Sequence, residues 1–247
     1  MRSTNVEDYQ NIPQPVAVLA KMHAAGTSTG WHSHPRGQLL YAISGLMVAS
    51  TEGGTWAVPT GHALEIPPGL RHEVAMHGDV ALRTAYIAPE EVRTPRSGTC
   101  RVILVSPLLD AALRALSEEP VQYDETGRGP HLAALILHEI EHASDAPFAL
   151  PLPEDGRLRK LCQALIDRPS LPYDIDAWAE EVGVGRRTLT RKFRNETGLS
   201  FGEWRRRLRF LHVLKRRAEG RLPKDDAAEV GYRSAQALAV MMRRMTR

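Results

Sequence analysis

Arg186–Gly198 reads R-R-T-L-T-R-K-F-R-N-E-T-G, and the string A-E-E-V-G-V stands just before it at Ala179–Val184. A near copy of that string, A-A-E-V-G-Y, occurs at Ala227–Tyr232. In both copies a glycine, Gly183 or Gly231, is followed by a few turn residues and then by a second apolar-periodic segment. Helix, glycine-containing turn and helix is the helix-turn-helix arrangement. The repeat therefore predicts two such units in the C-terminal part of the chain.

The second helix of each unit is predicted to bury one face. Leu189 and Phe193 are four residues apart, so they face the core of the first unit. In the helix expected at 235–245, Leu238 and Met242 take the same places. A connecting helix is predicted between the two units at 201–218, and its apolar stripe consists of Trp204, Leu208, Leu211 and Leu214.

Charge is divided unevenly along the chain. Residues 1–154 hold 10 Lys and Arg against 17 Asp and Glu, a net charge of −7. Residues 155–247 hold 22 Lys and Arg against 12 Asp and Glu, a net charge of +10. The basic half indicates either a module that binds a polyanion or an ordinary solvated basic surface.

A family resemblance favours the first interpretation, a module that binds a polyanion. The pattern R-T-L-x-R-x-F followed by E-T-G-x-S-F at Arg187–Phe201, then a connecting helix, then E-V-G-Y, resembles the DNA-binding domain of the AraC/XylS family of bacterial transcription regulators. The resemblance covers about residues 155–247. It implies that double-stranded promoter DNA is the partner and that the chain is not an enzyme.

The same resemblance implies which side chains contact DNA. They are expected to be Arg186, Arg187, Thr190 and Arg191 in the first unit, and Ser234, Gln236 and Arg243 in the second. Two departures from the family pattern bear on the units. Gly185 stands where a capping residue is usual, and Leu238 and Met242 stand where aromatic residues are common. Because the second reading face is mostly small and apolar, we expect the first unit to dominate sequence recognition.

The N-terminal part predicts a small β-barrel with a metal site. Residues 19–101 are rich in Gly and Pro and hold short apolar runs, which is typical of many short strands. The spacing from Gly26 through His-Ser-His to Gly45, and from Gly61 through Pro-Pro-Gly to a further histidine, resembles the two signature motifs of the cupin barrel. The predicted ligands are His32, His34, Gln38 and His72, because two histidines two apart on a strand point to one face.

Three imidazoles with open coordination positions suit Zn, Ni, Fe, Cu or Mn. Regulators with this barrel often lack the metal, so a small-molecule effector alone is a second possibility. An effector pocket is expected around Trp31, Tyr41, Trp56 and Met76. The alternative function is a metal-dependent cupin enzyme whose basic domain is an accessory, with Glu65 and Glu73 as candidate acid and base residues.

A second histidine pair has the spelling of a zinc protease motif. His138-Glu-Ile-Glu-His142 matches H-E-x-x-H, which places two imidazoles on one helical face. A third ligand downstream is missing, because the segment that follows is rich in proline and the next histidine is His212. Adventitious capture of Zn or Ni is therefore the favoured interpretation of the pair.

These observations predict an α+β chain with two domains. The predicted parts are a cupin-like barrel at 1–105, a helical dimerisation segment at 106–143 with helices at 107–119 and 130–143, a linker at 144–157, and the double helix-turn-helix domain at 158–247. A homodimer is expected through a stripe that is apolar for a lone surface helix, namely Leu132, Leu135, Ile136 and Ile140.

Composition sets the class of protein. The chain of 247 residues is 43% hydrophobic and 25% charged, which is typical of globular domains. No run approaches the roughly 20 apolar residues of a membrane span. The N-terminus lacks the basic and apolar pattern of a signal peptide, and two cysteines cannot build a disulfide framework. We therefore expect a cytoplasmic location.

Overall fold

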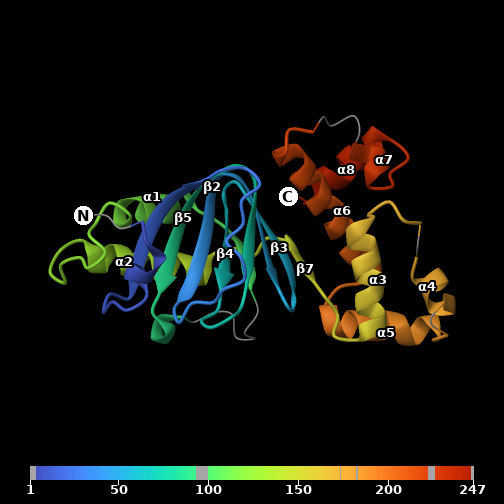
Figure 1. Ribbon diagram of the computed structural model, residues 1–247, viewed down its shortest axis with the longest axis horizontal. Helices are drawn as coiled ribbons and strands as arrows, with labels where there is room; N and C mark the ends of the chain where they lie inside the picture. The colour runs from blue at the N-terminus through green and yellow to red at the C-terminus, as the bar shows by residue number, and fades with distance from the viewer. Residues whose placement is uncertain (1–3, 93–99, 173, 182, 222–225, 246–247) are drawn as a thin grey trace. The chain divides into compact units, whose positions relative to one another are not determined.

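The computed structural model describes residues 4–92, 100–172, 174–181, 183–221 and 226–245. The chain forms two compact units, one of residues 1–51 and 56–146 and one of residues 52–55 and 147–247. Strands dominate the first unit and helices the second (Figure 1). The predicted α+β class, with a sheet-rich N-terminal region and a helical C-terminal region, is confirmed.

An antiparallel sheet forms the first unit. Its strands are β1 (Val16–His23), β2 (Gly37–Thr51), β3 (Gly54–Pro59), β4 (His62–Ile66), β5 (Glu73–Ile87) and β6 (Arg101–Leu104). The sheet runs in the order β1-β5-β2-β3, and β4 pairs with β2 and β6. Gln38 of β2 pairs with Tyr86 of β5, which places these two residues side by side in the sheet. Two short 3-10 helices, η1 (Val6–Tyr9) and η2 (Pro89–Glu91), flank the strands.

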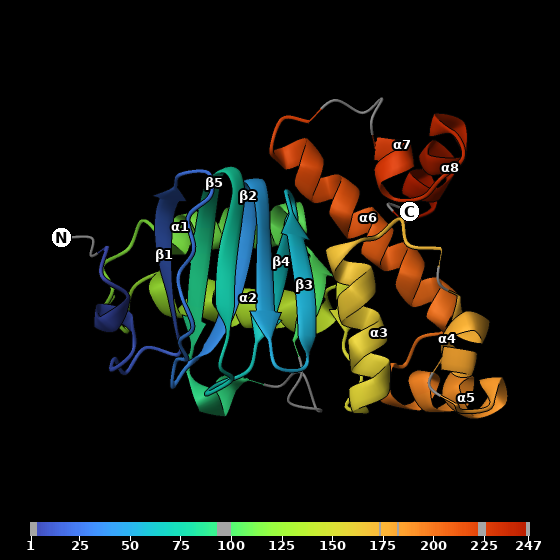
Figure 2. The ribbon, with the colours of Figure 1, turned by 45° about the vertical axis from the view of Figure 1, so that its right-hand side comes forward.

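Two helices, α1 (Pro107–Leu116) and α2 (Gly129–His142), lie against one face of this sheet (Figure 2). Ser106 caps α1, since its hydroxyl accepts a hydrogen bond from the amide of Leu109 at 2.9 Å. Sheet and helices share one core, which includes Leu39, Tyr41, Ala85, Leu109, Leu113, Ile136 and Ile140.

The stripe predicted as a dimer surface faces this core instead. Ile136 is fully buried and Ile140 is only 4% exposed. Leu132 and Leu135 are half-buried against the same cluster. The part of the prediction that leaves Ile136 and Ile140 free to pair two copies of the chain is therefore wrong, because these two residues already pack against α1 and the sheet of their own chain.

The second unit holds six helices among the described residues. They are α3 (Gly156–Asp167), α4 (Ile175–Glu181), α5 (Arg186–Thr197), α6 (Phe201–Ala218), α7 (Asp226–Glu229) and α8 (Ala235–Met245). The bounds of α6 and α8 are those predicted. Serine caps begin both helices, because Ser200 accepts from the amide of Glu203 and Ser234 accepts from the amide of Ala237, each at 3.2 Å.

The segment predicted as an extended linker contains a strand, β7 (Ala149–Pro151). Trp204 of α6 is fully buried and donates from its indole nitrogen to the carbonyl of Pro151 at 2.7 Å. Phe148 stacks on Phe210 with ring centroids 5.5 Å apart. The prolines exclude a helix here, but they are compatible with an edge strand. Residues 147–157 of this segment are therefore part of the second unit rather than a free linker, and residues 144–146 belong to the first unit.

Candidate functional site

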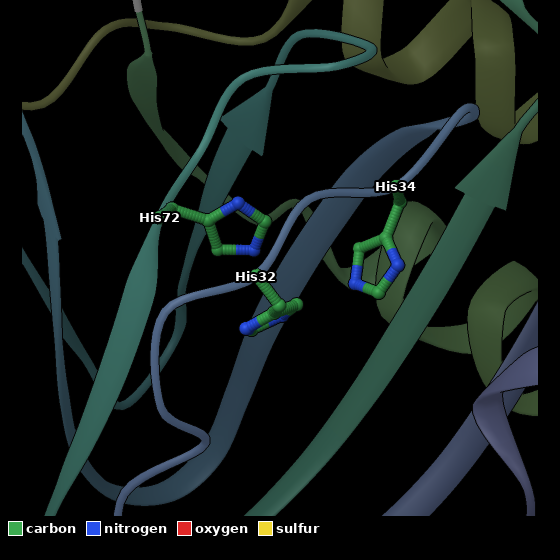
Figure 3. Close-up of side chains that lie close together, drawn as sticks. All are labelled: His32, His34 and His72. Carbon is green, nitrogen blue, oxygen red and sulfur yellow. The ribbon is translucent and has the colours of Figure 1, made fainter.

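Three imidazoles meet in the first unit. Figure 3 shows the rings of His32, His34 and His72 turned toward one another. Their centroids are 4.4 Å apart for His32 and His72, 4.8 Å for His32 and His34, and 5.6 Å for His34 and His72. One ring nitrogen of each lies within 4.8 Å of the others. The fold thus brings together the three histidines that the motif spacing selected.

Backbone hydrogen bonds position the triad. The loop before β2 pairs with the residues that lead into β5, because His32 and His72 exchange amide-to-carbonyl bonds of 2.9 and 2.8 Å. The amide of Gly69 donates to the carbonyl of His34 at 2.7 Å. These bonds hold two segments that are far apart in the sequence at a fixed distance, so the imidazoles are placed by the fold itself.

The ring orientations leave nitrogen lone pairs available. The Nδ1 atom of His32 lies 2.7 Å from the carbonyl of Gly30, and that of His72 lies 2.8 Å from the carbonyl of Leu70. Since a carbonyl only accepts, each Nδ1 carries a proton, and in the neutral ring Nε2 is then the atom with a lone pair for a metal. Burial, reinforced by the neighbouring His32 and His72, lowers the pKa of His34 to about 4. Burial also lowers the pKa of His72, so both buried rings are neutral near pH 7.

Two buried atoms test whether a metal fits here. The Nε2 atom of His72 and the Oε1 atom of Gln38 are buried without a hydrogen-bond partner among the described protein groups. Leaving such atoms unsatisfied is costly. A divalent cation bound by three imidazoles and an amide oxygen would satisfy both atoms. The residues present therefore fit a metal.

A cavity of about 420 Å³ lies beside the triad. His32, His34 and Gln38 line it together with Thr84 and Tyr86. Its apolar wall is formed by Leu19, Leu40, Val74, Met76 and Leu82. This volume lies in the range of small-molecule pockets, about 300–1,000 Å³.

Of the four residues expected to form an effector pocket, Met76 is the one that lines this cavity. Tyr41 is buried in the core under α1 and α2, since successive residues of β2 point to opposite faces. Trp56 is 5% exposed within β3. Trp31 is 45% exposed, with the guanidinium of Arg71 5.5 Å from its ring centroid. The expectation that all four surround one pocket is thus corrected.

In the first helix-turn-helix unit, α4 and α5 pack through Leu189 and Phe193, both buried as predicted. Arg187, Thr190 and Arg191 are exposed on the opposite side of α5. Arg186 is exposed too, but its guanidinium pairs with the carboxylate of Asp176 on α4 at 2.9 Å. Arg186 is therefore partly engaged within its own unit, while the other three predicted contact residues face solvent.

In the second unit, α7 and α8 place Gln236 and Arg243 on the exposed side of α8. Ser234 is exposed, and its hydroxyl serves as the N-cap of α8. The buried partner of Leu238 is Met241, at 5% exposure, rather than the predicted Met242, which is half-buried. A helix offers both the i+3 and the i+4 position to one face, and α8 uses the first.

The two second helices can be compared position by position. The second, fifth, sixth and ninth residues of α5 are Arg187, Thr190, Arg191 and Arg194, and those of α8 are Gln236, Ala239, Val240 and Arg243. All eight are exposed. Sequence reasoning missed Arg194, although its spacing of seven residues from Arg187 places it on the same face. The turns also differ, because two residues separate Gly183 from α5 and three separate Gly231 from α8.

Comparisons with known proteins agree with both halves of this geometry. Residues 178–247 match the family model of a helix-turn-helix domain, and residues 18–87 match that of a cupin domain. The HTH-type transcriptional regulator NimR of Escherichia coli (strain K12) is 26% identical over 99% of this chain and 90% of its own length. The chain thus combines an AraC-type helix-turn-helix domain with a cupin domain, and it is similar over nearly its whole length to an HTH-type transcriptional regulator.

Further relatives of this AraC-type chain match smaller parts or match weakly. The HTH-type transcriptional activator RhaR of Klebsiella pneumoniae is 31% identical over 45% of this chain and 39% of its own length. The solved structure of ToxT from Vibrio cholerae aligns with 94% of this chain and 95% of its own, at 10% identity and a TM-score of 0.38. The two domain matches and the relative NimR, not these weaker likenesses, support a DNA-binding regulator with an N-terminal cupin domain.

The H-E-x-x-H string of this AraC-type chain serves the packing of α1 and α2. Glu139 accepts a hydrogen bond from the hydroxyl of Ser106 at 2.5 Å, and Ser106 is the N-cap of α1. His138 and His142 are exposed, with ring centroids 4.2 Å apart. Two exposed imidazoles offer a weak surface site for a metal, and the glutamate between them is engaged in structure.

The two carboxylates considered as acid and base residues lie outside the cavity. Glu65 is 4% exposed and pairs with Arg101 at 3.1 Å. Glu73 accepts from the hydroxyl of Ser28 at 2.6 Å. Among the described residues that line the cavity, the one carboxylate is that of Glu7, which is exposed.

Within the part of the chain that the structure describes, no helix combines the length and the apolarity needed to cross a bilayer.

Proposed function

We propose that this AraC-type regulator binds a divalent metal in its cupin cavity and a small-molecule effector beside that metal, and that occupancy of the cavity changes how it binds promoter DNA. The meeting of His32, His34 and His72 beside a cavity of about 420 Å³ is the observation that carries the proposal. The cytoplasm, where promoter DNA is found, is the proposed location.

The ligand set of the proposal is His32, His34, His72 and Gln38. A bound cation would supply a Lewis acid to which a donor atom of the effector coordinates. The protein contributes the orientation of that effector. Thr84 and Tyr86 offer hydroxyl groups at the cavity wall, and Leu40 and Leu82 offer apolar contacts.

DNA recognition is proposed to depend mainly on the first helix-turn-helix unit. Arg187 and Arg191 can each bind the O6 and N7 atoms of guanine, and Thr190 can contact a thymine methyl group. The net charge of +10 on residues 155–247 supports a large phosphate contribution. Ser234 is reassigned in this proposal from base contact to helix capping, since its hydroxyl is already engaged.

A homodimer remains part of the proposal, with its surface elsewhere than on the α2 stripe. Light scattering of the purified chain measures this directly, and a monomer at micromolar concentration would contradict it. The alternative function, a metal-dependent cupin enzyme with a basic accessory domain, is less well supported. Its acid and base candidates are both paired outside the cavity.

Elemental analysis and a gel shift on DNA upstream of the chain's own locus test the proposal together. We expect about one divalent metal per wild-type chain, and none in the triple variant His32→Ala, His34→Ala, His72→Ala. The matched control is His138→Ala with His142→Ala, which removes the exposed pair and is expected to keep the cupin metal. Circular dichroism shows whether each variant is folded.

The outcomes separate the two parts of the proposal. Equal metal in the triad variant and the wild type would contradict the cupin site. A gel shift that is the same with and without the metal would contradict its regulatory role, while leaving DNA binding intact. Absence of any shift at low salt would contradict promoter binding itself.

A further inference from the structure

We infer that the second helix-turn-helix unit reads thymine through its methyl group, so that the operator consists of two chemically different half-sites. The inference rests on the proposed promoter binding and adds the base preference of the second unit. The juxtaposition that carries it is Val240 beside Ala239 and Gln236 on the exposed side of α8.

Val240 is an unusual residue for an exposed helix position. It is 38% exposed, one of five large hydrophobic side chains of such exposure among the described residues. The buried side of α8 is formed by Leu238 and Met241. Val240 therefore packs less completely than Leu238 and Met241, and part of its side chain is presented to solvent.

Val240 occupies a position in α8 that corresponds to a predicted DNA-contacting position in α5. It is the sixth residue of α8, as Arg191 is the sixth residue of α5. Ala239 likewise corresponds to Thr190, and Gln236 to Arg187. The face that carries guanidinium groups in the first unit thus carries an isopropyl group, a methyl group and an amide in the second.

The chemistry of the major groove assigns a target to each of these groups. An apolar side chain recognises the C5 methyl group of thymine, which cytosine lacks. Gln236 lies one helical turn before Val240 and can bind the N6 and N7 atoms of adenine. These residues together select A·T pairs, whereas Arg187 and Arg191 select guanine.

Cations beside Val240 suit the adjacent phosphates. Val240 borders a groove between α6 and α8 that also contains Arg206 and Arg244. Both arginines are exposed, and neither forms an ion pair with a described residue. Phosphate contacts position a recognition helix without reading sequence, so these arginines can hold α8 while Val240 reads the base.

The test begins with selection of binding sites by the full-length chain from random duplex DNA at one fixed salt concentration. We expect two half-sites about 34–36 Å apart, one containing guanine and one composed of A·T pairs. Each thymine of the second half-site is then replaced by deoxyuridine, which removes only the methyl group. Wild-type affinity should fall about fourfold at the contacted thymine, the equivalent of ~0.8 kcal/mol for one methyl-sized group.

Two variants make the result specific to Val240. Val240→Ala should bind the thymine and uracil sites equally, and Val240→Arg should shift the preference at that position toward guanine. The matched control replaces thymine by deoxyuridine in the first half-site. There Val240→Ala should not alter the effect of the replacement on affinity.

Three outcomes would overturn the inference: a wild-type chain indifferent to every uracil, equal losses for wild type and Val240→Ala, or selection of a single half-site. Failure to enrich any sequence would overturn promoter binding and is distinguishable from all three.

Discussion

The first and second helix-turn-helix units have the same arrangement of helices. They differ in the number of arginines on the exposed face of the second helix and in the hydrogen bonds that stabilise the start of that helix. Among the matched positions of the second helices, α5 presents Arg187, Arg191 and Arg194, and α8 presents one arginine, Arg243. The cap of α5 is Gly185, which provides no side-chain bond, whereas Ser234 caps α8. The unit with the more basic face therefore has the weaker helix start.

The two units also differ in the ionic contacts at the start of their first helices. Asp226, at the start of α7, is fully buried and lies 3.3 Å from Arg216 and 3.1 Å from Arg217, both on α6. In the first unit the repeat places Trp178 where Asp226 stands, and the carboxylate before α4, Asp174, is exposed and caps the helix by accepting from the amides of Asp176 and Ala177. The second unit depends on a buried ion cluster, and the first does not.

Removing Asp226 should have the largest effect. Asp226→Ala removes the buried carboxylate that Arg216 and Arg217 share, and because both guanidinium groups are partly exposed we expect a cost of about 1–3 kcal/mol. We expect the amides of α8 to exchange hydrogen on the order of a hundredfold faster, measured by mass spectrometry on the full chain. Asp174→Ala is the matched change and should cost about 1 kcal/mol, the value of an N-cap. Equal effects on α5 and α8 would erase the difference between the units.

Alanine at the two turn glycines should have a smaller effect, and an unequal one. Gly183 and Gly231 have φ angles of +63° and +72°, so alanine strains both by about 1–2 kcal/mol. At Gly231 a Cβ atom would also lie 3.2 Å from the backbone of Ser170, while at Gly183 it would meet nothing within 4 Å. Gly231→Ala should therefore lower the midpoint of thermal unfolding of its unit more than Gly183→Ala does. The reverse order would show that the contact with Ser170 yields easily.

Loss of a reading residue should cost DNA affinity rather than stability. Arg191→Ala removes a contact worth about 1–3 kcal/mol and should weaken operator binding roughly tenfold or more. Gln236→Ala should weaken it less. Both variants should be titrated with operator DNA at the same salt concentration, because the basic half makes DNA binding steeply salt-dependent. If Gln236→Ala is the more damaging change with folding intact, the second unit is the main reader.

A cap added to α5 should have the smallest effect. The backbone of Gly185 is at φ −59° and ψ 135°, and a Cβ atom there meets nothing within 4 Å. Gly185→Ser can accept from the amides of the first turn, as Ser234 does, and should stabilise the first unit by a few tenths of a kcal/mol. Ser234→Gly is the reciprocal control and should destabilise α8 by a similar amount. A Gly185→Ser variant that is less stable than the wild type in urea, or a Ser234→Gly variant that is more stable, would contradict the role given to the caps.

Local signals located the helices well. The 3.6-residue apolar period placed the bounds of α6 and α8 correctly, and Ser234 was the cap that marked the start of α8. The glycine, proline and histidine spacing also selected three residues that meet in space, His32, His34 and His72. Such signals are written in adjacent residues, so the sequence alone is enough to find them.

Long-range packing was the part that sequence reasoning missed. The period of α2 identifies an apolar side but not its partner, and Ile136 turned out to face its own sheet. Tyr41 was assigned to the cavity because it is aromatic, yet strand alternation places it under α1 and α2. Asp226 gave no sequence signal, since a carboxylate near a helix start is usually a solvated cap. These errors share a cause, because which face meets which neighbour depends on topology rather than on local pattern.

The extra residue in the turn of the second unit has a consequence for protein engineering. A chimera in which the two recognition segments are exchanged at the glycines would carry a turn that is one residue longer or shorter into the other unit. Exchange at the caps, Gly185 with Ser234, keeps Leu189 and Leu238 in the same place. The duplicated strings identify the repeat in the sequence, and the cap positions are the points at which the two recognition helices can be exchanged without a change of register.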